Sequence, residues 1–476
     1  MMDLMRWILA AVLVAGCSHD STKGTDGGGG GGDSGSGEAC AAVTACTDGD
    51  RCCPSGCDTD SDNDCVAMTA PLPDRLVVAS ITTPAGVIPG VSNWRIWGTA
   101  SLRVGPVYTV PLADCSTLVG YTTGTVAAPT ARVAVLDATD QLVTTHDLGA
   151  FTLRGLAAEP DGHFAALLWE QKADPATNQL HVRRYTAGFE QDYSTALANA
   201  QVAPDDFNIG ESRLEYGDGR YGAYFHVHGV DPNYFAYGHE GDELFWIDAA
   251  TGAPTLGWEW GCSHSMSELL RYSPAANTTL PVCVTDCYPG TSGDFATNSI
   301  GGIYLDHDAR KVLDVDAGCN GSVAGELGGL APGPAGWKLV FNAHQNPATT
   351  GTGSYSASTM NQDIGFTSIA SDQTPAAVVW LTTTPDDEAN ASIARWQPAG
   401  DDTEQYVVGW SSGTTYQLAR VSATGDLLEG PTPITAASWG ERDDPFRAQC
   451  NDDIVWAWFE SPGATTLNVA RLRSGN

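Results

Sequence analysis

Basic residues are scarce in this sequence. Its 476 residues include 23 Lys and Arg against 57 Asp and Glu, which gives a formal net charge of −34 at pH 7. A field of that sign repels phosphate backbones and anionic lipid head groups, so nucleic acid is not an expected partner. The same charge also has a plainer role, because a large net charge keeps a protein soluble.

Long amphipathic helical windows rich in Ala, Leu, Glu and Lys are also missing. The chain instead has 54 Gly, 26 Pro and 14 Trp, a composition typical of many short strands joined by tight turns. Its length exceeds the usual ~100 to 200 residues of one domain, so either several domains or one large repeat fold is expected. The sequence therefore predicts an all-β fold.

The apolar run nearest the start of the chain is too short to cross a bilayer. Residues 7–14 (WILAAVLV) lead through small residues to Cys17, whereas a membrane-spanning helix needs ~20 apolar residues. This pattern indicates an export signal. Residues 13–17 (LVAGC) resemble the lipobox of bacterial lipoproteins, which implies a signal peptide over 1–16, cleavage before Cys17 and lipidation of that cysteine. By the same resemblance, Ser18 implies attachment to the outer membrane of a bacterial cell envelope.

Residues 17–39 contain nothing that could build a core. After the first cysteine they are dominated by Gly, Ser and Asp, so they are predicted to form a flexible tether. About 20 such residues have an r.m.s. span of roughly 25 Å. The tether would let the globular part stand clear of the lipid.

Residues 40–66 combine six cysteines with almost no apolar bulk. Covalent cross-links are needed to order such a segment, and export supplies the oxidising compartment that disulfides require. Zinc binding is the alternative. Alternating aspartates resemble the start of a calcium loop but lack its later Gly and Glu, so weak Ca²⁺ binding and a solvated acidic loop both stay open. The residues are Cys40, Cys46, Cys52, Cys53, Cys57 and Cys65, with Asp58, Asp60, Asp62 and Asp64.

The other cysteines are even in number. Of the 13 cysteines, one is the predicted lipidation site and six lie in the segment just described, which leaves six. They are enough for three more disulfides, although the sequence does not give their pairing. These disulfide candidates are Cys115, Cys262, Cys283, Cys287, Cys319 and Cys450.

One pattern of turns and apolar strands recurs at roughly 50-residue spacing over 72–476, as in 217–252. The final unit, 451–474, lacks an outer strand, while an apolar strand at 74–80 stands alone before the first unit. If that strand supplies the missing edge, the ring closes and no bare edge strand remains. We therefore predict a β-propeller of about seven blades, with six and eight as the alternatives.

Chemically active residues are densest between 205 and 345. In a propeller, the loops after the second strands and the junctions between blades share one face, so the repeat register places 228–243 and 262–268 together. Loops longer than about 12 residues usually serve function, and polar loops on rigid strands are common binding sites. We expect a polar basin on this face, formed by His228, His239, Glu240, Asp242, His264 and Glu268.

The basin includes a His-x-His pattern. His226 and His228 lie two residues apart on a predicted strand, so both rings point to the same face. A metal site of nitrogen and oxygen ligands is predicted there, with His228, His239 and His264 as its histidines. A divalent cation is the one cofactor that these residues suggest. The alternative is that the histidines only satisfy hydrogen bonds of the loops.

Three familiar sequence motifs occur in this chain, but the residues around each of them do not support the function that the motif usually indicates. Residues 409–413 (GWSSG) match the nucleophile pattern G-x-S-x-G, but they join two predicted strands and no helix follows. Residues 246–252 with Trp258 resemble one repeat of the quinoprotein propellers, which repeat this motif around the ring, whereas this chain has one good copy. The glycine run 27–32 has no strand before it and no helix after it, so no phosphate-binding loop is predicted.

The lipobox, the tether, the Cys-Cys-Pro-x-Gly-Cys segment and the stretches GCSHSMSELLRYSP, CVTDCYPGTSGDF and GCNGSVAGEL together resemble lipoproteins of myxobacteria. The resemblance covers most of the chain and implies a lipid anchor, but no activity and no catalytic residue.

Two functions stay open, and the sequence names no substrate for either. We favour a surface-tethered binding or scaffolding module that takes a protein, glycan or small-molecule ligand through its long-loop face. The alternative is an exported metal-dependent hydrolase or lyase, or an oxidoreductase, that uses the histidine and acid cluster on that face.

Overall fold

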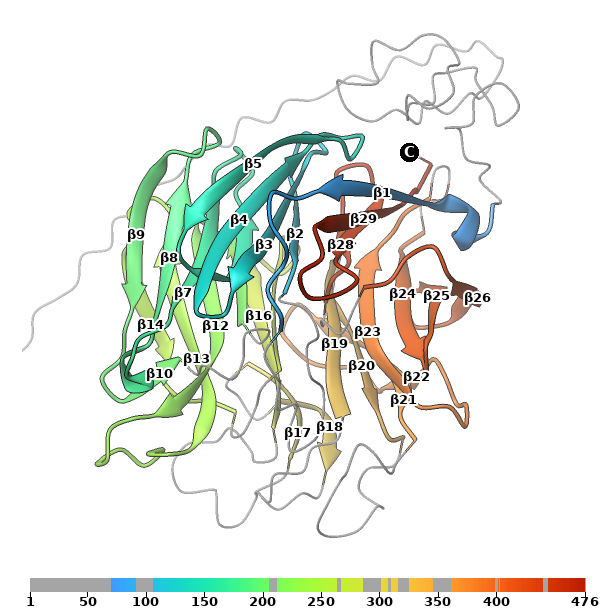
Figure 1. Ribbon diagram of the computed structural model, residues 1–476. Coiled ribbons are helices and arrows are strands. Elements are labelled where there is room, and N and C mark those ends of the chain that lie inside the picture. Colours follow the sequence, from blue (N-terminus) through green and yellow to red (C-terminus); the bar gives the residue numbers. More distant parts are fainter. Residues whose placement is uncertain are drawn as a thin grey trace, which may run out of the picture. The chain divides into compact units, whose positions relative to one another are not determined.

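The computed structural model shows a ring of antiparallel sheets (Figure 1). All described residues belong to one compact unit, Gly32–Asn476. Among them, no helix has the length and apolar character needed to span a bilayer. The structure describes residues 70–90, 106–204, 212–262, 267–285, 301–306, 310–315, 325–345, 361–398, 401, 403–439 and 444–475.

The strands form seven blades, named A to G here, which confirms the predicted all-β propeller and its blade number. From inner to outer strand, blade A has β2 (Tyr108–Pro111), β3 (Thr117–Thr125), β4 (Ala128–Leu136) and β5 (Leu142–Gly149). Blade B has β6 (Thr152–Ala158), β7 (Phe164–Glu170), β8 (Gln179–Tyr185) and β9 (Gln191–Leu197). Blade C has β11 (Ser212–Gly217), β12 (Arg220–Gly229), β13 (Glu240–Asp248) and β14 (Pro254–Trp258), with β10 (Val202–Pro204) paired to the end of β12. Blade D has β15 (Glu268–Ser273), β16 (Thr278–Thr285), β17 (Gly301–Leu305) and β18 (Arg310–Val315); blade E has β19 (Gly325–Gly333), β20 (Gly336–Ala343), β21 (Asp363–Ala370) and β22 (Val379–Trp380); blade F has β23 (Glu388–Arg395), β24 (Gln405–Ser412), β25 (Thr415–Ser422) and β26 (Leu427–Ile434); and blade G has β27 (Arg447–Ala448), β28 (Ile454–Trp458), β29 (Thr466–Leu472) and β1 (Leu76–Thr82).

Strand β1 closes the ring. It follows the short 3-10 helix η1 (Leu72–Arg75) and pairs with β29, from Leu76 opposite Leu472 to Thr82 opposite Thr466. Figure 1 shows β1, in blue, beside the red β29 and β28. The predicted closure by the lone N-terminal strand is confirmed, with the strand starting two residues later than expected.

A disulfide also joins the two blades that meet at the closure. Cys115 lies in the β2–β3 turn of blade A and Cys450 in the β27–β28 turn of blade G, with their Cα atoms 5.3 Å apart. A second disulfide joins Cys262 to Cys283, Cα to Cα 6.4 Å. These two bonds use four of the predicted disulfide candidates. The other candidates, Cys287, Cys319 and the six between residues 40 and 66, lie outside the described residues, as does Cys17.

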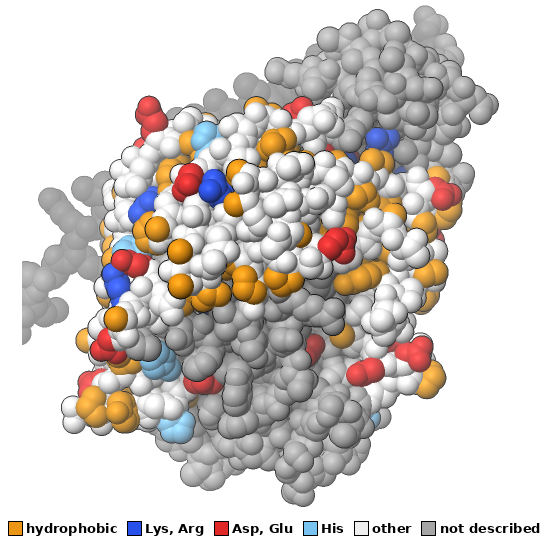
Figure 2. Space-filling model, viewed as in Figure 1, with side chains coloured by type: hydrophobic (Ala, Val, Ile, Leu, Met, Phe, Trp, Pro, Cys, Tyr) orange, Lys and Arg blue, Asp and Glu red, His pale blue; other side chains and the backbone are white. Residues whose placement is uncertain are grey.

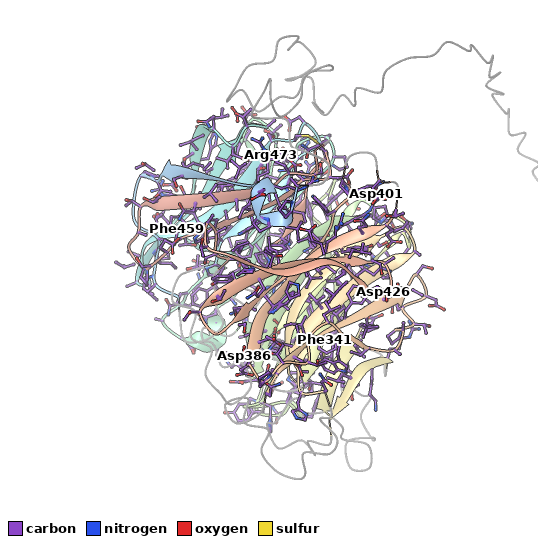
Figure 3. All side chains as sticks on the ribbon, turned by 90° about the vertical axis from the view of Figure 1, so that its right-hand side faces the viewer. Phe341, Asp386, Asp401, Asp426, Phe459 and Arg473 are labelled. Carbon is purple, nitrogen blue, oxygen red and sulfur yellow. A yellow bond between two sulfur atoms is a disulfide. The ribbon has the colours of Figure 1, made fainter. Side chains whose placement is uncertain are left out.

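Strand β20 shows how the blades build their cores. Its side chains alternate between two faces, because successive residues of a strand point to opposite sides. Trp337, Leu339 and Phe341 pack into the core shared with blade D, whereas Val340 packs into the core shared with blade F. Every blade is thus covered on both faces, which explains strands with long apolar runs. Phe341 is labelled in Figure 3.

Polar residues occupy the outer turns. Asp386 and Asp426, labelled in Figure 3, lie in exposed turns of the ring. On the face drawn in Figure 2, the acidic side chains of the described residues are spread over the surface and do not form one patch. This distribution fits the role of the net charge in solubility.

Candidate functional site

A long connection follows the second strand in each of three blades. Residues 230–239, 286–300 and 344–362 follow the second strands of blades C, D and E, three consecutive blades. Because neighbouring strands are antiparallel, the second strands of these blades end on the side of the ring where the blade junctions lie, and the turns between first and second strands lie on the other side. We name these the long-loop end and the short-turn end. Much of the long-loop end lies outside the described residues.

Strands β12 and β13 bring three predicted basin residues and His226 onto one face of blade C. His226 lies opposite Asp242, and His228 opposite Glu240. Residues two apart on a strand point to the same side, so the four side chains share the face that packs against blade D. This seam between blades C and D, at its long-loop end, is the candidate site.

His226 sits between two carboxylates. Its Nδ1 lies 3.9 Å from Oε1 of Glu268, the first residue of β15, and its Nε2 lies 4.0 Å from Oε2 of Glu240. The side chains of His226 and Glu268 are fully buried, while that of Glu240 is 30% exposed. The three groups therefore run from the interior of the seam toward the long-loop surface.

His228 adds a second ring beside Glu240. Its Nδ1 is buried and has no hydrogen-bond partner among the residues that the structure describes. The histidine is only partly buried as a whole, and it lies opposite Glu240 in the strand pair. The seam thus gathers imidazole nitrogen and carboxylate oxygen, the donor types that bind zinc and similar ions.

Asp242 has a structural role next to the candidate site. Its carboxylate accepts hydrogen bonds from the Tyr224 hydroxyl at 2.5 Å and from Nε1 of Trp258 at 2.9 Å. Burial raises the pKa of Asp242 to about 7 in spite of these donors. Its carboxylate oxygen also lies within 4.8 Å of the sulfurs of Cys262 and Cys283. Because those sulfurs are bonded to each other, they offer no thiolates to a metal.

The structure brings His228, Glu240, Asp242 and Glu268 of the predicted basin together at the seam. His239 is exposed at the end of the 230–239 loop, where its carbonyl accepts a hydrogen bond from the Gly229 amide.

Several other predictions from the sequence fall elsewhere or remain untested. His264 and the four aspartates of the proposed calcium loop lie outside the described residues. Residues 409–413 join β24 to β25 through a turn, so they form no nucleophile elbow. His226 was not among the predicted basin residues. Its place in the His-x-His pattern is the feature of the sequence that could have identified it.

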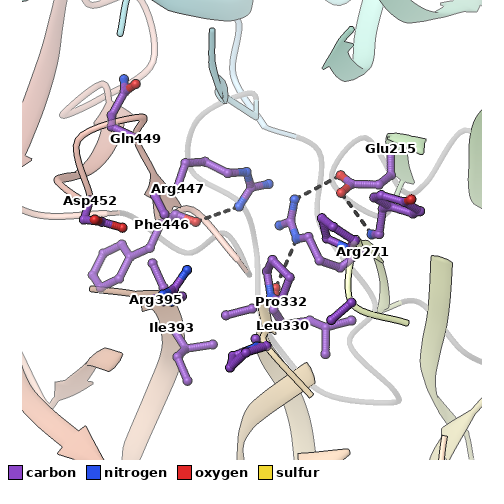
Figure 4. Close-up of a pocket in the computed structure, with 18 residues that line it drawn as sticks. Glu215, Arg271, Leu330, Pro332, Ile393, Arg395, Phe446, Arg447, Gln449 and Asp452 are labelled. Atoms are coloured by element: carbon purple, nitrogen blue, oxygen red, sulfur yellow. Dashed lines mark hydrogen bonds and ion pairs between the residues drawn. The ribbon is translucent and has the colours of Figure 1, made fainter. Parts of the chain in front are cut away.

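A second feature, which the sequence did not predict, is a cavity of about 500 Å³ lined by inner strands of blades C to G (Figure 4). Residues of the first turns of blades D, E and G line it, so it lies at the short-turn end. Its polar residues include Arg271, Arg395 and Arg447 from three different blades. The signal in the sequence was an arginine on the inner strand of each of these blades.

No family model matches the chain, and no curated protein matches it in sequence. Among solved structures, polysaccharide lyase Uly1 is 8% identical with a TM-score of 0.44, over 84% of this chain and 99% of that one. The Dos1 propeller is 10% identical with a TM-score of 0.41, over 82% and 95%.

An acylaminoacyl peptidase from Pyrococcus horikoshii is 9% identical, with a TM-score of 0.41, over 74% of this chain and 48% of that one. This chain therefore spans about half the length of the peptidases that it matches. Identities of 8 to 10% do not carry an activity from these proteins to this one.

Proposed function

We propose that this chain is an envelope-anchored binding module that holds a divalent transition-metal ion at the long-loop end of the seam between blades C and D. The observation that carries the proposal is His226, whose two ring nitrogens each lie within 4.0 Å of a carboxylate, one from its own blade and one from the next.

Three side chains are the proposed ligands: Nε2 of His226, a ring nitrogen of His228 and the carboxylate of Glu240. Zinc ligands lie at ~2.0 to 2.2 Å from the ion. Two atoms 4.0 Å apart are therefore near the upper limit for sharing one ion. A small inward movement of the Glu240 side chain, which is 30% exposed, would bring its oxygen and Nε2 of His226 to the spacing of two ligands of one ion.

Glu268 is the proposed supporting carboxylate. A metal-bound histidine usually gives its other ring N–H to a carboxylate, which fixes the ring tautomer and raises its basicity. Glu268 faces Nδ1 of His226 on the side away from Glu240, at 3.9 Å. Because both side chains are fully buried, the ring is held in one orientation.

The membrane anchor is part of the same proposal. Cys17 would carry the lipid, and residues 18–39 would let the propeller reach its ligand at the bacterial outer membrane. Three protein ligands leave a coordination position open toward the long loops. A protein, glycan or small-molecule partner would bind there. The same open position supports a second candidate function, a metal-dependent hydrolase or lyase, because a bound water becomes a nucleophile on such an ion.

Zinc titration of the detergent-solubilised full-length protein tests the site. We expect one ion per propeller, a more than 100-fold loss of affinity in H226A and in E240A, and weaker binding below pH ~6, since protonated imidazole cannot ligate a metal. H163A is the matched control, because His163 lies on blade B and pairs with Asp161. Equal zinc affinity in wild type, H226A and E240A would reject the site.

A further inference from the structure

The cavity at the short-turn end has the features of a second binding site. It measures about 500 Å³ and is lined by residues of five blades. Ligand sites of small molecules usually have about 300 to 1,000 Å³, with apolar walls and a few convergent polar groups. Leu330, Ile393 and Phe446 supply apolar wall here. None of the residues that line the cavity belongs to the proposed metal site.

Arginines converge on this cavity although the chain is strongly acidic. In Figure 4, Arg447 and Arg271 extend toward its middle from opposite sides, and Arg395 lies beside Ile393. The whole chain has only 23 Lys and Arg residues against 57 Asp and Glu. Three of the few basic residues of the chain thus line one cavity.

Arg271 and Arg395 differ in their hydrogen bonds and ion pairs with the rest of the protein. Arg271 donates to the Leu330 carbonyl at 3.0 Å and to Glu215 at 3.0 Å, and it pairs with Asp444. Arg271 is thus held in place as part of the wall. In contrast, Arg395 donates through Nη2 to Gln397 at 2.8 Å. Its Nε is buried with no hydrogen-bond partner in the described part of the chain.

A buried guanidinium N–H without a partner costs free energy, so a ligand that accepts a hydrogen bond there is favoured. Carboxylates and phosphates fit the planar guanidinium fork. The local charge separates these two classes. Glu215 and Asp452 line the same cavity, and Asp444 lies against Arg271. Three acids offset three arginines, which permits one added negative charge but repels a phosphate dianion.

We propose that this cavity binds a small organic monocarboxylate with an apolar body. The carboxylate accepts from Nε of Arg395, with Arg447 nearby, and the body packs on Leu330, Ile393 and Phe446. Asp452 sets the limit on negative charge. This site is separate from the proposed metal site and does not depend on it, because the two lie at opposite ends of the ring.

Benzoate is a suitable probe, with benzamide as its neutral isostere and inorganic phosphate as the competing anion. Calorimetry and ligand-observed NMR on the full-length protein should detect benzoate, with benzamide and phosphate at least 10-fold weaker. R395Q should weaken benzoate at least 10-fold. R310Q, on the outer strand β18 of blade D, should leave it unchanged.

The variant D452N tests whether charge in the cavity controls the benzoate affinity, because a purely structural role of Asp452 would not make binding tighter. Removing the opposing negative charge should tighten benzoate binding several-fold. Asp452 has φ of 60°, a conformation that Asn tolerates, so this variant should fold. The proposal is overturned if wild type does not bind benzoate, if benzamide or phosphate binds as well, or if R395Q and D452N both match wild type. Zinc titration of the same variants should give the wild-type zinc affinity, which distinguishes a failure of the cavity proposal from a failure of the metal-site proposal.

Discussion

Arg471 on β29 donates hydrogen bonds from Nε and Nη2 to the two carboxylate oxygens of Asp140, at 3.0 and 2.7 Å, although the residues are 331 positions apart in the chain. Asp140 lies in the β4–β5 turn of blade A, and Arg471 belongs to blade G. Both side chains are buried, and Asp453 lies 3.3 Å from the same guanidinium. A buried bidentate ion pair thus joins the first and last blades.

Breaking that pair should destabilise the ring. D140N leaves the buried Arg471 charge with Asp453 alone, and removing one partner of a buried pair costs about 3 to 5 kcal/mol. Denaturant unfolding should show this loss. D147N is the control, because Asp147 faces Arg132 at 3.7 Å with 54% of its side chain exposed, and such surface pairs contribute about 0 to 1 kcal/mol. Equal effects of D140N and D147N would show that the pair does not hold the closure.

Deleting residues 72–82 should damage the fold more broadly. The deletion removes β1 and leaves one edge of β29 unpaired, so unfolding should become less cooperative and aggregation should rise. Calorimetry and light scattering at matched concentration measure both effects. A deletion variant that melts like the parent would contradict the closure by β1.

The two disulfides should differ in their contribution to stability. Cys115–Cys450 spans 335 residues and Cys262–Cys283 spans 21. In the loop-entropy model, a disulfide that closes the longer loop adds about 2 kcal/mol more to the free energy of unfolding than one that closes the shorter loop. The double variant C115S/C450S should therefore lose more unfolding free energy than C262S/C283S. The opposite order would mean that the second disulfide stabilises mainly through local packing in the seam.

Glu243 should make stability depend on pH. Burial raises the pKa of Glu243 to about 8, and Asn199 donates to its carboxylate at 2.8 Å. An unfolded glutamate titrates near 4.3, so the folded state binds more protons between these values. Its stabilising contribution is present at low pH and is lost as pH rises through 8.

The variant E243Q keeps an acceptor for Asn199 and removes this titration. Its melting temperature should exceed that of wild type at pH 8 and above, and the difference should shrink toward pH 5. E190Q, at an exposed position, is the control for the same chemical change. Parallel melting curves for wild type and E243Q over this pH range would contradict the assignment.

The ring could be predicted from the sequence because strand signals are local. The lone apolar strand near residue 76 and the incomplete last unit together specified the pairing of β1 with β29. The His226–His228 face followed from the two-residue period of a strand.

Contacts across blades could not be predicted in the same way. The approach of Glu268 to His226 depends on how blade D packs against blade C, and Arg271, Arg395 and Arg447 meet only because the ring closes. Asp242 looked like a basin ligand by spacing. Its burial beneath Tyr224 and Trp258 follows from side-chain packing that no linear pattern records.

The central claim is the metal site between His226, His228 and Glu240. The most direct measurement is an anomalous diffraction map at the zinc absorption edge from crystals of the protein grown with zinc. We predict one strong peak within ~2.2 Å of Nε2 of His226 and of a Glu240 carboxylate oxygen, with Glu268 hydrogen-bonded to Nδ1 of the same ring. Zinc at other positions, with none at this seam, would contradict the account.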